Sequence, residues 1–135
     1  MTLIVSQPAS ARVSTAQALT DLNAMRAAAG VPPVTSFRRG WNSGCRMHNR
    51  YMHATGQFGH SEDRASRFYS RSGARAGRSS VIAYPSSLPS SAWGNTIYHR
   101  LALLQPRLRR SGYNGAYGYS CLQVLSGARL SVRSS

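Results

Sequence analysis

The segment 41–63 constrains the fold of this chain more than any other segment. It holds three of the four histidines, one of the two cysteines and two of the three acidic residues. The segment also carries Trp41, Cys45, His48 and Met52, which have the i, i+4, i+7 and i+11 spacing of one helix face. We therefore predict a helix over residues 41–55 that ends at Gly56 and is followed by a polar turn.

A second predicted helix precedes this segment. Residues 16–29 are rich in Ala and Leu, which favour helices, and Ser14 or Thr15 offers an N-cap. One face of the helix carries apolar residues at regular spacing: Ala18, Leu22, Met25 and Ala29. Gly30, followed by Pro32 and Pro33, predicts the end of this helix.

The remainder of the chain contains the clearest strands. We expect mostly loop over 64–78, with at most one helical turn, and a strand or helical turn over 81–84. A helix from Ser90 or Ser91 to about Leu104 follows, and Pro106 ends it. A hairpin over 112–119 and a buried strand over 119–125 follow. Because the predicted helices come first along the chain and the clearest strands come last, we predict an α+β fold. The length of the chain predicts one domain, with a lead-in at 1–13 and a polar tail at 127–135.

The charge balance is strongly basic and limits what the protein can bind. The chain has 17 Lys+Arg against 3 Asp+Glu, for a net charge of +14, and every one of these basic residues is Arg. At least fourteen guanidinium groups therefore lack a carboxylate partner, and we expect them in solvent or facing an external anion. A nucleic acid, an anionic lipid surface and an acidic cell-wall polymer would all satisfy this charge.

No segment predicts insertion into a membrane. Residues 1–10 lack the charged start and the long apolar run of a secretory signal, and no run of about 18 apolar residues exists. We therefore expect a soluble monomer that is either cytoplasmic or a secreted protein without its leader.

The two cysteines fall on the helix face and in the predicted buried strand, at Cys45 and Cys121. A helix packed on that strand's sheet would bring both into one core. They form either a disulfide, which would stabilise the fold by about 4–5 kcal/mol in the chain-entropy model, or two buried free thiols. We favour the disulfide. A zinc site at the cysteines is not expected, because neither belongs to a CxxC pair.

The histidines differ in their predicted roles. His48 is expected to be a hydrogen-bonded core residue, whereas His53 is expected at the surface. His60, in the polar turn, and His99, in the third helix, could converge on a divalent metal such as zinc, with water or Glu62 completing the ligands. They could also form an acid/base pair. Spacing alone favours a simpler role, in which each braces the local backbone.

The sequence contains no GxSxG, GxxxxGKS/T or GxGxxG motif. Two arginine clusters remain. The segment 64–78 has five arginines interleaved with Phe68 and Tyr69, and a second cluster consists of Arg107, Arg109 and Arg110. The arginines could bind a phosphate backbone, and the aromatic rings between them could stack on bases. We favour a solvated surface that binds anions without specific recognition.

Four segments, in order, resemble the CAP superfamily of cysteine-rich secretory proteins, insect venom antigens, plant pathogenesis-related proteins and their bacterial SCP-like relatives. They are LNAMRAAAGVPP at 22–33, HNRYM and GQFGHSED within 48–63, AGRSSVIA at 76–83, and a block that runs from Trp93 through Tyr98, His99 and Arg100 to Gly112 and Tyr113. The resemblance extends from residue 19 to about residue 125.

The resemblance implies a three-layer α-β-α sandwich with a central, mostly antiparallel sheet, in a protein of the secreted type. It also implies a cleft in which two histidines and two glutamates hold a divalent metal. His60 and His99 match the two histidine positions. The glutamate positions are not matched, because residues 78–81 and the helix over 93–99 contain no acid and Glu62 is the only glutamate of the chain. The family-type site is therefore half present.

The leading hypothesis is a CAP domain that binds an anionic or lipid ligand outside the cell without being an enzyme, with a weak metal site at His60 and His99. An alternative from another class is a metal-assisted hydrolase that uses these two histidines as ligands and Glu62 as base. A weaker alternative is a basic protein that binds nucleic acid.

Overall fold

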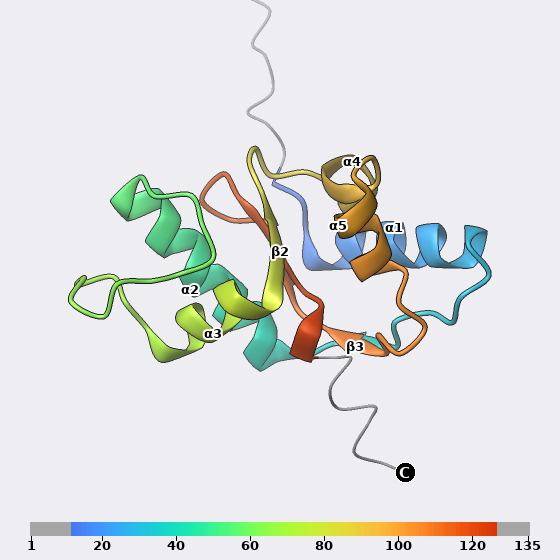
Figure 1. Ribbon diagram of the computed structural model, residues 1–135, viewed down its shortest axis with the longest axis horizontal. Coiled ribbons are helices and arrows are strands. Elements are labelled where there is room, and N and C mark those ends of the chain that lie inside the picture. Colours follow the sequence, from blue (N-terminus) through green and yellow to red (C-terminus); the bar gives the residue numbers. More distant parts are fainter. Residues whose placement is uncertain (1–11, 127–135) are drawn as a thin grey trace, which may run out of the picture.

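The computed structural model describes residues 12–126, which form three layers. A central sheet separates two helical layers (Figure 1). One layer contains α2 (Arg39–Thr55) and α3 (Arg71–Ser79), and the other contains α1 (Thr15–Ala28), α4 (Pro89–Trp93) and α5 (Ile97–Leu103). The predicted α+β class and α-β-α layering are confirmed. The predicted tail and all but the last two residues of the predicted lead-in lie outside the described residues.

The central sheet is antiparallel, in the order β2 (Ser80–Ala83), β5 (Ser120–Gln123), β4 (Tyr113–Asn114). A separate parallel pair joins β1 (Ser36–Phe37) to β3 (Arg110–Ser111). Because side chains alternate along a strand, Val81 and its partner Leu122 lie in the core cluster with α1, α4 and α5. Ile82 and its partner Cys121 lie in the cluster with α2 and α3. The sheet therefore has both faces buried.

Helix α1 begins and ends where its sequence predicts. The Ser14 hydroxyl accepts a hydrogen bond from the Gln17 N–H at 3.1 Å, and the Gln17 side chain accepts one from the Ser14 N–H at 2.9 Å. This reciprocal capping box satisfies two donors that the helix itself leaves without partners. Past the other end of the helix, Gly30 has a φ of 72°, which glycine adopts without steric cost.

The buried side of α1 contains a guanidinium that the sequence analysis placed in solvent or against an external anion. Arg26 is fully buried. Its Nε donates to the Pro32 carbonyl at 2.8 Å, and its Nη1 donates to the Leu103 carbonyl at 2.6 Å. Burial lowers the pKa of Arg26, and the positive charge of Arg109 lowers it further. The expectation was therefore wrong for Arg26, because two backbone carbonyls accept from this cation in place of a carboxylate, although its Nη2 forms no hydrogen bond within residues 12–126.

Helix α2 confirms the predicted helix, beginning two residues earlier and ending at Gly56, whose φ is 69°. Helix α3 lies within the segment that was predicted to be mostly loop, so that prediction was wrong for residues 71–78. A β-carbon on Gly44 would lie 3.0 Å from the Ser72 carbonyl oxygen, and one on Gly77 would lie 2.5 Å from His48 Cε1. Glycines lower the intrinsic helix propensity of α3. They also permit the close α2–α3 packing that stabilises α3.

The helix predicted from Ser90 or Ser91 to about Leu104 is two short helices, α4 and α5, separated by residues 94–96. Gly94, Asn95 and Thr96 are poor helix formers, which accounts for the break. Trp93 fixes the end of α4, since its ring is buried and its Nε1 donates to the Ile82 carbonyl of β2 at 3.2 Å. The expected strands near 81–84 and 119–125 are present as β2 and β5.

A disulfide joins Cys45 of α2 to Cys121 of β5, as the sequence predicted, and there is no free cysteine among residues 12–126. The bond lies in the second core cluster with Met52, Ala76 and Ile82. It therefore ties one helical layer directly to the middle strand of the sheet. Within 12–126, the structure contains no helix long and apolar enough to cross a membrane.

Reduction of this disulfide should lower the free energy of unfolding by about 4–5 kcal/mol, because the bond closes a loop with a sequence separation of 76 residues. Urea titrations with and without reductant measure the difference. A Cys45→Ala/Cys121→Ala variant serves as the control, since its stability should not respond to reductant. A wild-type midpoint that does not move on complete reduction would contradict the prediction.

Candidate functional site

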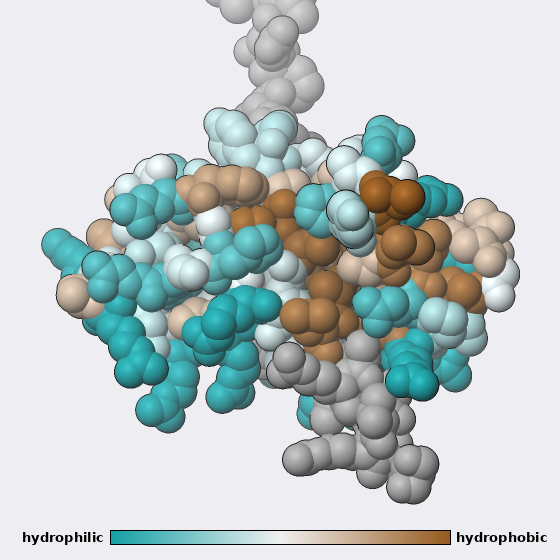
Figure 2. Space-filling view, in the orientation of Figure 1, coloured by the Kyte–Doolittle hydropathy of each residue, from teal (hydrophilic) through white to brown (hydrophobic). Residues whose placement is uncertain are grey.

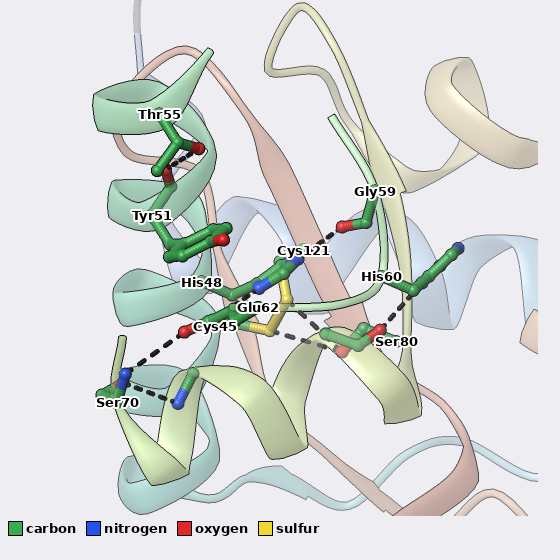
Figure 3. Close-up of polar contacts among 12 residues, drawn as sticks. Cys45, His48, Tyr51, Thr55, Gly59, His60, Glu62, Ser70, Ser80 and Cys121 are labelled. Atoms are coloured by element: carbon green, nitrogen blue, oxygen red, sulfur yellow. Dashed lines mark hydrogen bonds and ion pairs between the residues drawn. A yellow bond between two sulfur atoms is a disulfide. The ribbon is translucent and has the colours of Figure 1, made fainter. Parts of the chain in front are cut away.

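The best-defined polar arrangement in the structure is a buried pair formed by His48 of α2 and Glu62 of the turn after α2 (Figure 3). His48 Nδ1 lies 2.7 Å from Glu62 Oε2, and both side chains are fully buried. His48 Nε2 lies 2.8 Å from the Gly59 carbonyl oxygen. The other carboxylate oxygen, Glu62 Oε1, accepts a hydrogen bond from the Ser70 N–H at 3.2 Å.

Hydrogen-bond chemistry fixes the number of protons in this pair. A carbonyl oxygen can only accept, so His48 Nε2 must carry a hydrogen that it donates to Gly59. A second hydrogen must lie between Nδ1 and Glu62 Oε2, because two lone pairs would otherwise face each other across 2.7 Å. The pair is therefore imidazolium with carboxylate or imidazole with carboxylic acid. Both forms have a net charge of zero.

Glu62 also lies against the first turn of α3. A β-carbon on Gly73 would be 2.7 Å from Glu62 Oε2, and the Ser70 hydroxyl caps the helix by accepting from the Gly73 N–H at 2.9 Å. The exposed N–H groups of a first helical turn favour a carboxylate nearby. Glu62 therefore links α2, the turn and α3. This confirms the predicted core role of His48 and gives it a partner that the sequence analysis had assigned to the metal site.

His60 points away from this pair (Figure 3). Its ring is exposed, and its Nδ1 donates to the Gly77 carbonyl at the C-terminal part of α3, at 2.8 Å. His99, on α5, is half-buried, and its Nδ1 lies 2.8 Å from the Thr96 hydroxyl. Both rings thus brace local structure through Nδ1, while no hydrogen bond from either Nε2 is formed within residues 12–126. His53 is exposed, as predicted, and its ring lies 5.8 Å from that of Tyr117.

The donor groups for a metal are limited. No three His, Cys, Asp or Glu side chains of residues 12–126 come together in a way that could hold an ion. Both cysteines are in the disulfide, and the carboxylate of Glu62 is bonded to His48. His60 and His99 each keep an Nε2 without a hydrogen bond within residues 12–126, so each ring has one nitrogen that could bind a metal.

The surface of the α2–α3 layer is dominated by guanidinium groups. We define the arginine surface as the exposed arginines of α2, α3 and the segment between them: Arg39, Arg46, Arg50, Arg64, Arg67, Arg71, Arg75 and Arg78. Hydrophilic side chains gather over this layer on the left of Figure 2. The two acidic residues of the same region, Glu62 and Asp63, accept hydrogen bonds from His48 or from backbone N–H groups. They do not neutralise the arginine surface.

Aromatic rings position some of these cations. The guanidinium carbons of Arg50 and Arg67 lie 5.6 and 5.3 Å from the centre of the Phe68 ring. That of Arg46 lies 5.8 Å from the centre of the Tyr117 ring. Such contacts stabilise a guanidinium without reducing its charge. The sequence indicated that Phe68 lies among arginines, but only the fold brings Tyr117 to Arg46.

Two substitutions of Glu62 should separate its structural role from a role as base. Glu62→Gln can accept from the Ser70 N–H and donate to His48 Nδ1, so the free energy of unfolding should stay within about 1 kcal/mol of wild type. Glu62→Ala removes both bonds inside the core and should cost about 2–3 kcal/mol. Chemical denaturation measures both values. Equal losses for the two variants would refute the hydrogen-bonding account.

Comparisons with known proteins identify the family and the fold. The sequence model of the cysteine-rich secretory protein family, CAP, matches residues 19–124. The fold is similar to the 1.5 Å crystal structure of an extracellular protein containing a SCP domain from Bacillus anthracis str. Ames, with a TM-score of 0.65 and 17% sequence identity over 82% of this chain. This chain covers 39% of that one. A search of curated proteins finds no match. Because the family model matches well over half of the sequence, the chain belongs to the cysteine-rich secretory protein (CAP) family.

Proposed function

We propose that this CAP domain is a non-enzymatic binding module that holds an anionic ligand on its arginine surface and works outside the cell. The observation that carries the proposal is that no arginine within residues 12–126 forms an ion pair with a carboxylate at 4.0 Å or less. Each of the three carboxylates accepts a hydrogen bond from a group other than a guanidinium. Asp21 accepts from the N–H and hydroxyl of Ser90, Glu62 bonds His48, and Asp63 accepts from the Ala65 N–H.

The geometry of α3 favours a polymer with repeated anionic groups. Arg71, Arg75 and Arg78 follow the i, i+4, i+7 spacing, so they form a row on one helix face. The opposite face of α3 buries only small residues, Gly73, Ala74, Ala76 and Gly77. The row is thus presented by a helix that is held tightly against α2. Repeated cations at this spacing suit an acidic cell-wall polymer or another extended polyanion better than they suit one small ion.

The aromatic residues favour binding to the backbone of the polymer rather than recognition of bases. Single-stranded nucleic acids are usually held by bases stacked on aromatic side chains. Phe68 already contacts two guanidinium groups, and Tyr117 contacts Arg46 and His53. On this proposal, nucleic acid binds through its phosphates without regard to sequence. The similarity to an extracellular SCP-domain protein supports an extracellular location.

Replacement of Arg71, Arg75 and Arg78 by Gln should weaken binding to a labelled DNA duplex by about tenfold or more at low salt. Each lost phosphate contact should lower the slope of log K against log salt by about 0.9, so the slope should fall by about two to three. Fluorescence anisotropy over a salt series measures both quantities. Long-chain inorganic polyphosphate should compete with the duplex, since the proposed contacts do not involve bases.

The matched control is a triple variant that removes three charges elsewhere, with Gln at Arg107, Arg109 and Arg110. It has the same net charge as the α3 variant but keeps the row on α3. If both triple variants lost the same affinity and the same salt slope, binding would depend only on the net charge, and the arginine surface would not be the site.

We also propose a weak divalent-metal site at His60 and His99. The observation in its favour is that the carbonyl of Gly77 requires a hydrogen on His60 Nδ1, which leaves Nε2 as the lone-pair nitrogen of a neutral ring. For His99 the same holds when Nδ1 donates to the Thr96 hydroxyl, which accepts as readily as it donates. A bound metal would supply Lewis acidity. Hydrolysis with Glu62 as base would require this carboxylate to leave His48, so we keep it as an alternative to the non-enzymatic function.

Zinc titration with metal analysis tests this site. The His60→Ala/His99→Ala variant should lose bound zinc relative to wild type, because it removes both ligands. A His53→Ala variant is the matched control, since His53 is an exposed histidine outside the proposed site. Equal zinc content in wild type and the double variant would eliminate the proposal.

A further inference from the structure

Helix α5 presents apolar side chains to solvent on the side that does not face the core. Ile97, Tyr98 and Leu101 are 69%, 85% and 60% exposed, whereas Leu103 of the same helix is fully buried. Positions i, i+1 and i+4 lie within about 100° of one another around a helix, so the three side chains form one face. Burial of Leu103 attaches α5 to the core. The exposed face is therefore not needed for packing within residues 12–126.

The segment that carries this face has charged side chains of one sign only. Residues 97–110 contain four arginines, Arg100, Arg107, Arg109 and Arg110, and no carboxylate. All four are exposed. In Figure 2 apolar side chains gather over α5 and β2, whereas the surface over α4 is pale, and the hydrophilic surface of the α2–α3 layer borders the apolar side chains on the left. In this view the apolar surface therefore adjoins the surface that we propose binds anions.

This combination favours an anionic lipid bilayer over a second copy of the chain. Two copies that met through α5 would bring together molecules with a formal charge of +14 each. A bilayer that contains anionic lipids offers the complementary chemistry, with negative headgroups above an apolar interior. Tyrosine is enriched at the level of the headgroups, where its ring is apolar and its hydroxyl remains hydrated. Arginine side chains near an anionic leaflet are attracted to the lipid phosphates.

We propose that the α5 face docks on the interface of an anionic lipid bilayer. Ile97 and Leu101 enter the boundary between headgroups and acyl chains, Tyr98 lies at the headgroup level, and the arginines of residues 97–110 contact the lipid phosphates. Docking of this kind places a short amphipathic helix in the plane of the interface without spanning the membrane. The inference goes beyond the proposed anion binding, because its charge contribution comes from the arginines of residues 97–110 and its apolar contribution comes from α5.

Sedimentation with vesicles of phosphatidylcholine, with and without phosphatidylglycerol, tests the proposal with the whole chain. Wild type should bind the anionic vesicles, and part of this binding should persist at about 0.5 M salt, where charge interactions are strongly screened. Ile97→Ser/Leu101→Ser should bind about tenfold more weakly at that salt concentration. Its affinity for soluble polyphosphate should equal that of wild type. Phe58→Ser is the matched control, because Phe58 is 57% exposed but belongs to the turn after α2.

A second measurement reports insertion directly. A Tyr98→Trp variant adds a third tryptophan to the two of the wild type. Anionic vesicles should shift the emission of this added tryptophan to shorter wavelength, and wild type measured with the same vesicles gives the background from its own tryptophans. No shift, or equal vesicle binding by wild type and Ile97→Ser/Leu101→Ser, would overturn the inference while the proposed anion binding stands. Self-association of wild type that the double substitution abolishes would overturn it in favour of a second copy. Salt-resistant, α5-dependent vesicle binding without polyphosphate binding would support the apolar docking and refute the proposed function.

Discussion

The hydrogen bond between His48 and Glu62 determines how three segments of this protein meet. It attaches the turn after α2 to the middle of that helix, and the second carboxylate oxygen receives the Ser70 N–H at the start of α3. The glycines of α2 and α3 let the two helices approach until no β-carbon would fit. The disulfide from Cys45 to Cys121 then attaches this layer to β5. Without the buried pair, α3 would lose the group that lies over its first turn.

The partners of the few carboxylates have a consequence for the charge of the surface. Asp21, Glu62 and Asp63 accept hydrogen bonds from a histidine, a serine hydroxyl and backbone N–H groups, so none of them forms an ion pair with an arginine within residues 12–126. Repulsion among uncompensated cations opposes a compact state. The disulfide and the buried pair offset this repulsion, and a bound polyanion or an anionic membrane would reduce it. The stability of the fold and its proposed binding are therefore linked through the same arginines.

Local signals allowed much of the fold to be predicted. Helix ends could be predicted because capping and left-handed backbone depend on a few neighbouring residues. The start of α1 is marked by Ser14 with Gln17, and the ends of α1 and α2 are marked by Gly30 and Gly56. Helix α3 was missed because its glycines have low helix propensity and serve a contact with α2 that is remote in sequence. The break between α4 and α5 was missed because the apolar pattern continues across residues 94–96, although the helix does not.

In the candidate site, too, some features could be predicted from the sequence and others depended on the tertiary structure. The sequence by itself determined that His48 and Cys45 share the buried face of a helix, that Cys121 lies in a core strand, and that most guanidinium groups have no carboxylate partner. Only the tertiary structure decided that Glu62 bonds His48 rather than accompanying His60, and that Arg26 donates to the carbonyls of Pro32 and Leu103. It also decided which apolar residues of α5 remain exposed. Helix periodicity is local, but the partner of a buried polar group depends on which distant segments pack around it.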